Sequence, residues 1–205
     1  HVGGRSLLWG RHSYRLNKID FEANQTDGHG VDWPIRYEDL ASWYGYAEKF
    51  AGIQGMKEGL DVLPDGEFMP PMDLNIVEKD IREKLKKQYN NKRILTVGRT
   101  ANITVPHNNR TNCQYRNRCW RGCPFGAYFS TQSATLPAAM ATGNLTLRPF
   151  SLVTKVNYNK DTKKATGVEI LDTTDNKTYE FKSKIVFLCA SSFNSTWVLM
   201  NSATD

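Results

Sequence analysis

Three cysteines lie close together in the middle of the chain. They are Cys113, Cys119 and Cys123, separated by five and three residues, and Pro124 follows the last one. Thiolates at such spacing can ligate a zinc ion or an iron–sulfur cluster, and two of them can form a disulfide in an exported protein. Zinc would need a fourth ligand, for which His107 is the nearest candidate. Structural thiols or a disulfide, an iron–sulfur cluster and a zinc site, in that order of preference, all stay open.

A second chemical signal is a Gly-Gly-x-Ser turn near the first residue. Because glycine has no Cβ, such a turn lets the backbone approach a bulky, charged ligand closely. Taken alone, the two glycines also fit an ordinary tight turn. A tryptophan and another glycine follow at short distance, so that the full motif is Gly3, Gly4, Arg5, Ser6, Trp9 and Gly10.

Two amphipathic helices are predicted in the first half of the sequence. The first covers 37–50, where apolar residues recur at helical spacing and Gly52 closes the pattern. The second covers 74–89, where an apolar stripe faces a Lys/Arg/Glu surface, and Asp73 is placed to cap it. We expect the first 31 residues, which are rich in Gly, Asn and Asp, to be irregular.

The cysteines fall in a long loop that we expect over 98–132. A strand is predicted before it at 93–97, and a short helix after it at 136–141, with Gly143 at the end of that helix. Loops of this length without regular structure are uncommon unless they have a function.

The pattern changes to strands in the last third of the chain. Strands are expected at 145–147, 152–158, 165–172, 177–182 and 185–189, and a helix from about Asn194. The last strand is apolar throughout, which is typical of the middle of a parallel sheet, and its Cys189 is expected to be a buried apolar residue. The fold class is therefore α+β or α/β, with helices first and an antiparallel meander after them.

Composition excludes few functions. The 205 residues carry a net charge of +6, with 40% hydrophobic and 23% charged residues, as in ordinary globular proteins. Basic residues are scattered rather than collected in one run, so we expect no nucleic-acid binding and explain the charge by an anionic ligand or an acidic partner. No apolar run approaches the roughly 20 residues of a membrane helix, so we expect no direct membrane insertion.

The N-terminal motif, together with DWPIRYEDLASWY at 32–44, resembles the flavin-contacting region of the glucose-methanol-choline (GMC) oxidoreductases. In that family the Gly-Gly-x-Ser turn lies on the loop over the flavin ring. Trp9 resembles the sugar- and gluconate-dehydrogenase-like branch, in which some members carry a flavin-bound His directly before this Trp. Leu8 stands there instead, so the resemblance implies FAD that is bound non-covalently.

The C-terminal third resembles the same family. GNLTLRPFSLVTKV, KKATGVEIL and KIVFLCASSFNSTWVLMNS follow the order of the family's meander in the FAD domain. The resemblance implies that Val153 contacts the adenine through its backbone. It also implies that Ala190 and Ser191 lie beside the nucleotide.

The resemblance implies the central part of a longer GMC-type FAD-binding fold. Its parts would be a flavin-contacting loop region at 1–31, a helical and cysteine-containing substrate-domain side at 32–132, and the meander and strand–helix part of the FAD domain at 133–205. The family's G-x-G-x-x-G turn and its C-terminal pair of a His with a second His or Asn have no match here. We therefore expect the catalytic residues outside this sequence and no activity from this piece alone.

The implied reaction is oxidation of a CH–OH group of a sugar, sugar acid or polyol by hydride transfer to flavin. An electron-transfer subunit is an expected partner, and a periplasmic or exported location is expected rather than a cytoplasmic one. Some sugar dehydrogenases of this branch carry a three-iron cluster in a loop with an ending similar to Cys123-Pro-Phe-Gly-Ala here. The alternative function is a cysteine-loop metal or iron–sulfur module, for electron transfer or structure, without flavin catalysis.

Overall fold

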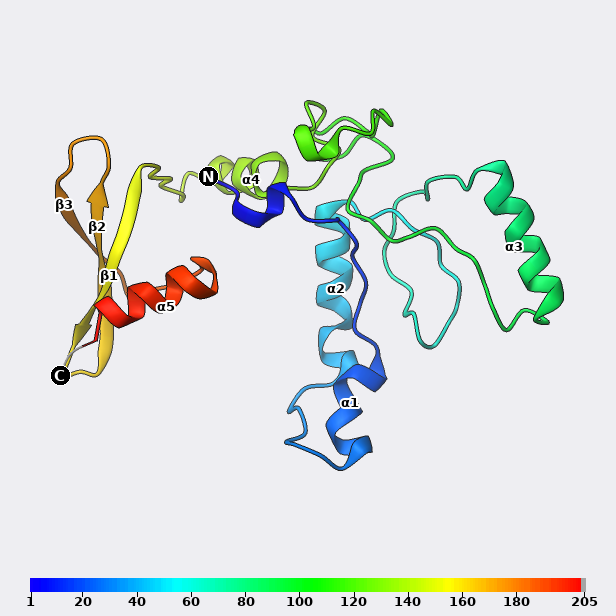
Figure 1. The fold of residues 1–205 in the computed structure, drawn as a ribbon, viewed down its shortest axis with the longest axis horizontal. Helices are drawn as coiled ribbons and strands as arrows, with labels where there is room; N and C mark the ends of the chain where they lie inside the picture. The colour runs from blue at the N-terminus through cyan, green and yellow to red at the C-terminus, as the bar shows by residue number, and fades with distance from the viewer. Residues whose placement is uncertain (204–205) are drawn as a thin grey trace. The chain divides into compact units, whose positions relative to one another are not determined.

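The computed structural model describes residues 1–203. The chain divides into two compact units, His1–Leu145 and Thr146–Asp205, and each is described by itself. Figure 1 shows that the first unit consists of helices joined by long irregular segments, whereas the second is a small sheet with one helix.

The first unit contains the two expected amphipathic helices and two more. Its elements are η1 (Gly4–Leu7), α1 (Lys18–Asp27), α2 (Tyr37–Ala51), α3 (Ile76–Gln88), η2 (Cys119–Arg121), η3 (Thr131–Thr135) and α4 (Leu136–Ala141). Helix α2 ends as predicted at Gly52, whose φ of 77° places it in the left-handed region. Helix α4 confirms the short helix after the cysteine loop.

Three predictions for this unit were wrong. The segment expected to be irregular contains α1, which begins with a capping box in which Asn17 and Asp20 satisfy each other's backbone N–H groups. Helix α3 is capped by Asn75 rather than Asp73, because the Asn75 side chain accepts the N–H of Glu78. Residues 93–97 form no strand, since no neighbouring segment pairs with them.

A short extended segment, 99–103, is the centre of the first unit. Ala101 and Ile103 are completely buried in it. On one edge, Arg11 accepts the N–H of Ala101 at 2.9 Å, and the Ala101 carbonyl accepts the N–H of Phe129 at 3.0 Å. Thr100 exchanges two backbone hydrogen bonds with Gln54 on the other edge. Segments more than 80 residues apart in the sequence are therefore joined here.

The second unit is a three-stranded antiparallel sheet in the order β1-β2-β3. The strands are β1 (Ser151–Asn159), β2 (Lys164–Asp172) and β3 (Thr178–Lys182), which confirms the predicted meander. Helix α5 (Ser191–Asn201) packs on β1, and Ser202 at its end accepts the N–H of Val156 at 2.7 Å. The helix thus covers part of the edge of β1 that has no strand neighbour.

Two strands predicted for the last third of the chain are also absent from the described residues. Residues 145–147 and 185–189 are not strands, because no segment of the described chain pairs with them. Phe187 is 83% exposed, and Cys189 is exposed rather than buried as expected. Among the residues that the structure describes, this apolar run has no strand beside it to pair with.

We predict that Gly52→Ala destabilises the protein more than Gly59→Ala. Both glycines have a left-handed φ, which costs an alanine about 1–2 kcal/mol. A Cβ at Gly59 meets nothing within 4 Å, whereas one at Gly52 would collide with the Ile103 side chain and adds an overpacking cost of about 1–3 kcal/mol. Denaturant unfolding of the full-length protein measures both losses, and equal losses would contradict this packing.

Candidate functional site

The Gly-Gly-x-Ser turn is held in place through its serine. Gly3 and Gly4 have φ values of 100° and 48°, which only glycine adopts easily. Ser6 Oγ donates to the Gly3 carbonyl at 2.5 Å and accepts the N–H of Thr131 at 2.9 Å. A Cβ on Gly4 would meet nothing within 4 Å, so its backbone faces open space that a ligand can occupy.

Trp9 anchors the next part of this loop. Its Nε1 donates to the Phe129 carbonyl at 2.9 Å, and the two rings meet edge to face with centroids 6.1 Å apart. The Tyr128 hydroxyl donates to the Trp9 carbonyl at 3.3 Å. Arg5 and Gly10 of the same motif are exposed. The motif therefore has a fixed side, against 128–131, and an exposed side.

A cleft of about 480 Å³ separates this motif from the cysteine loop. Leu7 and Leu8 line one side of it, and Cys119, Trp120 and Cys123 line another. The guanidinium of Arg11 lies 5.7 Å from the Trp120 ring and 5.1 Å from that of Tyr128, which ties the two loops together.

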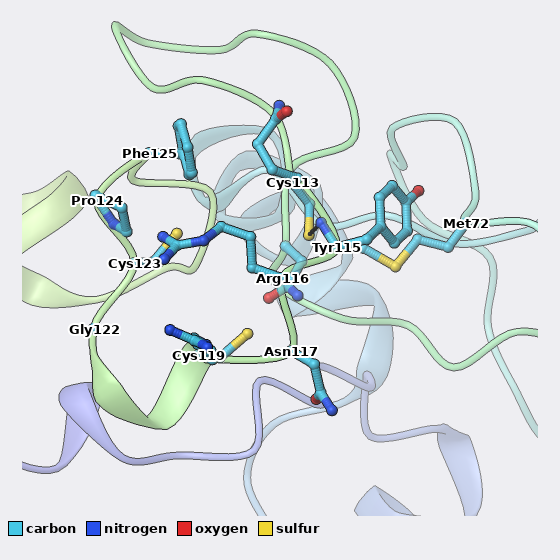
Figure 2. Close-up of a pocket in the computed structure, with 13 residues that line it drawn as sticks. Met72, Cys113, Tyr115, Arg116, Asn117, Cys119, Gly122, Cys123, Pro124 and Phe125 are labelled. Atoms are coloured by element: carbon cyan, nitrogen blue, oxygen red, sulfur yellow. Dashed lines mark hydrogen bonds between the residues drawn. The ribbon is translucent and has the colours of Figure 1, made fainter.

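All three loop cysteines line a second cavity of about 230 Å³, shown in Figure 2. Arg116 and Arg118 share its wall with the thiols. The cysteines are held by separate anchors: the N–H of Cys113 donates to the Ile103 carbonyl at 2.9 Å, whereas Cys119 begins the turn η2. The loop thus brings the thiols to one cavity.

This arrangement does not form a metal site. Among residues 1–203, no group of three or more His, Cys, Asp or Glu side chains is placed to hold a metal ion. The alternative of an iron–sulfur cluster on Cys113, Cys119 and Cys123 therefore finds no support. These three cysteines and Cys189 are all free thiols in the structure.

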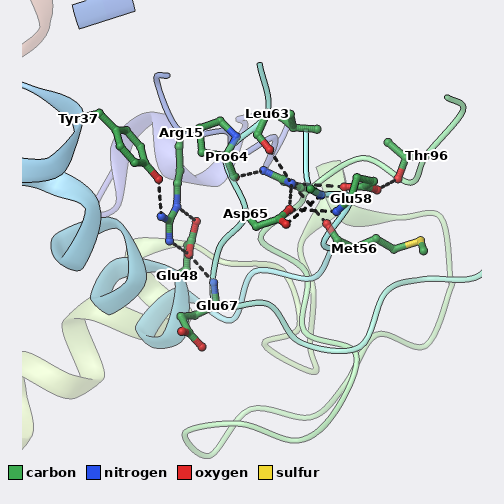
Figure 3. A network of polar contacts seen from close by, with 12 residues as sticks. Arg15, Tyr37, Glu48, Met56, Glu58, Leu63, Pro64, Asp65, Glu67 and Thr96 are labelled. Atoms are coloured by element: carbon green, nitrogen blue, oxygen red, sulfur yellow. Dashed lines mark hydrogen bonds and ion pairs between the residues drawn. The ribbon is translucent and has the colours of Figure 1, made fainter. Parts of the chain in front are cut away.

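Buried ion pairs hold the loops that carry the site, as Figure 3 shows. Glu48 accepts from Arg15 Nε at 2.8 Å and from Nη2 at 2.7 Å, and these bonds hold the pKa of Arg15 above its usual range. Arg99, which is 1% exposed, lies 3.1 Å from Asp65 and 3.4 Å from Glu58. Arg99 also donates to the carbonyls of Met56, Leu63 and Pro64.

The three residues that the resemblance places near the nucleotide lie in the second unit. Val153 is in β1, paired with Ile170, directly before a break in the register. Ala190 and Ser191 begin α5, and Ser191 has a φ of 64°, which is uncommon for a residue other than glycine. The first turn of α5 contains no acidic residue and no side chain caps it. Its free N–H groups are therefore suited to a negatively charged group.

Sequence reasoning missed the residues that position the motif. Tyr128, Phe129 and Thr131 contact it from as far as 125 positions away. No local pattern marks such contacts, because spacing within one element carries no information on distant partners.

Comparison with known proteins identifies the family. The family model of the GMC oxidoreductases matches residues 1–205. The chain belongs to the GMC oxidoreductases. FAD is the cofactor of this family, as the resemblance in the first residues implied.

This GMC oxidoreductase chain is similar to three named enzymes. It is 28% identical to 2-methyl-1,2-propanediol dehydrogenase of Mycolicibacterium austroafricanum over 99% of the chain and 36% of the relative. It is 26% identical to the fructose dehydrogenase large subunit of Gluconobacter japonicus over 67% of the chain and 25% of the relative. It is also 26% identical to paromamine 6'-oxidase of Streptomyces fradiae, over 98% and 36%.

The chain thus spans about a third or less of the length of these curated relatives. Among residues 1–203, no helix is both long and apolar enough to cross a bilayer.

We predict that Ser6→Ala loosens the motif without affecting the rest of the first unit. Loss of Oγ leaves the N–H of Thr131 without its acceptor, which corresponds to roughly a tenfold change in local opening. Hydrogen exchange of the full-length protein should then be faster over 1–10 and 129–133. Ser13→Ala is the matched control, because Ser13 Oγ bonds only the nearby Arg11 carbonyl. Unchanged exchange at 1–10 in Ser6→Ala would refute the anchoring role.

Proposed function

We propose that the protein containing this chain oxidises a CH–OH group of a sugar, sugar acid or polyol with non-covalently bound FAD. The observation that carries the proposal is the Gly3–Gly4 turn, in which the Gly4 backbone faces open space while the far side of the motif is fixed to 128–131. In a chain that belongs to the GMC oxidoreductases, this is the position at which a flat ring can approach the backbone.

We assign the flavin side of the cofactor to the first unit. The backbone of Gly3 and Gly4 would lie against the ring, with Ser6 fixing their geometry and Trp9 with Gly10 extending the contact. The exposed guanidinium of Arg5 is available to a negatively charged part of the cofactor.

We assign the nucleotide side to the second unit. The backbone of Val153 on the edge strand β1 would contact the adenine, and Ala190 and Ser191 would lie near the charged part of FAD. The uncapped N-terminus of α5 supports this, because its N–H groups favour a negative charge.

The names of the relatives support the substrate class. They refer to a propanediol, to fructose and to paromamine, and the first two are CH–OH compounds by name. The cofactor supplies the hydride acceptor, and two electrons with two protons leave the CH–OH group to give a carbonyl. The residues here bind and orient; we assign no catalytic base to this chain.

The cysteine-loop module without flavin is the weaker alternative. It needs a metal held by the loop, whereas the thiols of residues 1–203 form no ligand group for one. It also leaves the fixed and exposed sides of the Gly-Gly-x-Ser motif without a role.

We further propose that the cysteine loop receives an acidic electron-accepting protein. Arg118, Arg121, Tyr115 and Trp120 are exposed on it, and Trp, Tyr and Arg are the residues that most often dominate interfaces. One relative is named as the large subunit of its enzyme, which supports a partner subunit. An exported location would suit such a partner.

Gly4→Ala should weaken FAD binding by at least about tenfold in the full-length apoprotein, since the added Cβ enters the space that we assign to the ring. Gly28→Ala is the control, because Gly28 has a similar φ of 70° and equally open surroundings at the end of α1. Flavin fluorescence titration compares them. Equal affinity of both variants for FAD would remove the turn from the cofactor site.

Arg118→Glu should slow reduction of an acidic protein acceptor by roughly tenfold at low ionic strength, and the effect should vanish in about 1 M salt. Lys87→Glu makes the same charge change on the exposed face of α3 and should have a much smaller effect. Stopped-flow mixing measures both rates, with an uncharged dye as a second acceptor. Identical rates for the two variants would exclude docking at the loop.

A further inference from the structure

Three arginine side chains of the first unit are almost completely buried, and only two of them face a carboxylate. Arg15 binds Glu48 (Figure 3), and Arg99 forms ion pairs with Glu58 and Asp65. The third is Arg110, which is 5% exposed. No ion pair among residues 1–203 includes it.

Arg110 has a single hydrogen bond from its side chain within the described residues. Nη2 donates to the Ala51 carbonyl at 2.7 Å, while Nε and Nη1 are buried without an acceptor. The Phe129 ring lies 5.8 Å away and offers no hydrogen-bond acceptor of comparable strength. The burial lowers the pKa of Arg110, because no nearby negative charge opposes the loss of water.

The surroundings of Arg110 hold it in this place. Its backbone exchanges two hydrogen bonds with His107, of 3.1 and 2.9 Å. A Cβ on Gly126 would lie 3.2 Å from Arg110 Cγ, and one on Gly52 would lie 3.2 Å from Nη2. Two glycines with left-handed φ values therefore make the room that this side chain fills.

Arg110 also lines a cavity of about 460 Å³. Asn108, Asn109 and Ser133 contribute polar groups to its wall beside Arg110, and Phe50 with helix α4 contributes the apolar part. The wall thus combines one uncompensated cation with amide side chains that can donate to a carboxylate, whereas the Ser133 hydroxyl already donates to the Tyr128 carbonyl at 2.8 Å.

The surrounding sequence offers no acid to fill this role. No Asp or Glu occurs between Glu83 and Asp161, while thirteen Lys and Arg do. Within 84–160 the chain thus contains basic residues and no acidic ones, although the basic residues form no continuous run. Glu48, the buried acid of helix α2, is already bound to Arg15.

We propose that the cavity beside Arg110 binds a carboxylate group that residues 1–203 do not supply. A buried guanidinium that is left unpaired is strongly unfavourable, and a carboxylate in this cavity relieves that cost. The carboxylate belongs either to an Asp or Glu elsewhere in the full polypeptide or to a free carboxylic acid. The proposal does not depend on flavin chemistry.

The thermal stability of full-length Arg110→Met tests the proposal, since Met fills similar space without charge. If the carboxylate is a side chain of the polypeptide, the Tm of this variant at about pH 8 should fall by several degrees, because that carboxylate is left buried and unpaired. The orphaned carboxylate has a raised pKa, so lowering the pH toward about 4 protonates it in the variant and should shrink the loss.

Two further variants calibrate this result. Arg99→Met removes a cation whose carboxylate partners are known and should show the same loss and the same pH trend. Arg116→Met, at an exposed side chain without an ion pair in the described residues, should change the Tm little. If Arg110→Met does not accumulate, Arg110→Lys keeps the charge and should retain the wild-type pH trend. A Tm of Arg110→Met that is unchanged or higher, or a loss independent of pH, overturns the proposal when acetate also leaves the wild-type Tm unchanged.

Added acetate distinguishes the two sources. If the carboxylate is free, about 0.1 M acetate should raise the wild-type Tm relative to chloride at the same ionic strength, and Arg110→Met should not respond. If it is a side chain of the polypeptide, acetate should leave the wild-type Tm unchanged.

Discussion

Buried arginine–carboxylate contacts are the interactions on which the first unit depends. Few residues of its long loops pair with another segment as in a β-sheet. The backbone carbonyls of these loops therefore need hydrogen-bond donors from side chains. Arg99 supplies several of them, to Met56, Leu63 and Pro64, while its charge is balanced by two carboxylates. Removing one partner of such a buried pair costs about 3–5 kcal/mol, because the other charge remains unpaired. The loops are therefore positioned by polar contacts more than by apolar packing.

The same region places the residues assigned to the cofactor. The segment that begins at Arg99 continues through Ala101, whose backbone binds both Arg11 and Phe129. The Phe129 carbonyl in turn accepts the Trp9 indole N–H, so two consecutive hydrogen bonds connect Trp9 to the segment that contains the buried arginine. A loop that approaches a flat cofactor needs such support, because a rigid backbone loses less entropy when the ligand binds.

Much of the fold was predictable from local signals, and the failures share a cause. Helix α2 and the three strands carry periodic patterns with clear ends, whereas 185–189 has an apolar strand pattern but no strand to pair with among the described residues. The types of the site residues were recognisable as a motif, and the resemblance identified the family. The contacts of Ser6 and Trp9 with residues more than 100 positions away were not predictable, since residue spacing in the sequence does not indicate such distant partners. The cysteine spacing suggested a metal, which the arrangement of the thiols does not support.

The central claim is that this chain is part of an FAD-dependent oxidoreductase that acts on CH–OH groups. The most direct measurement is the visible absorption spectrum of the full-length protein, purified and kept without oxygen. The account predicts the bands of oxidised flavin, at roughly 370 and 450 nm, released on denaturation and bleached when a sugar or polyol is added. A protein that stays colourless after incubation with FAD would contradict it.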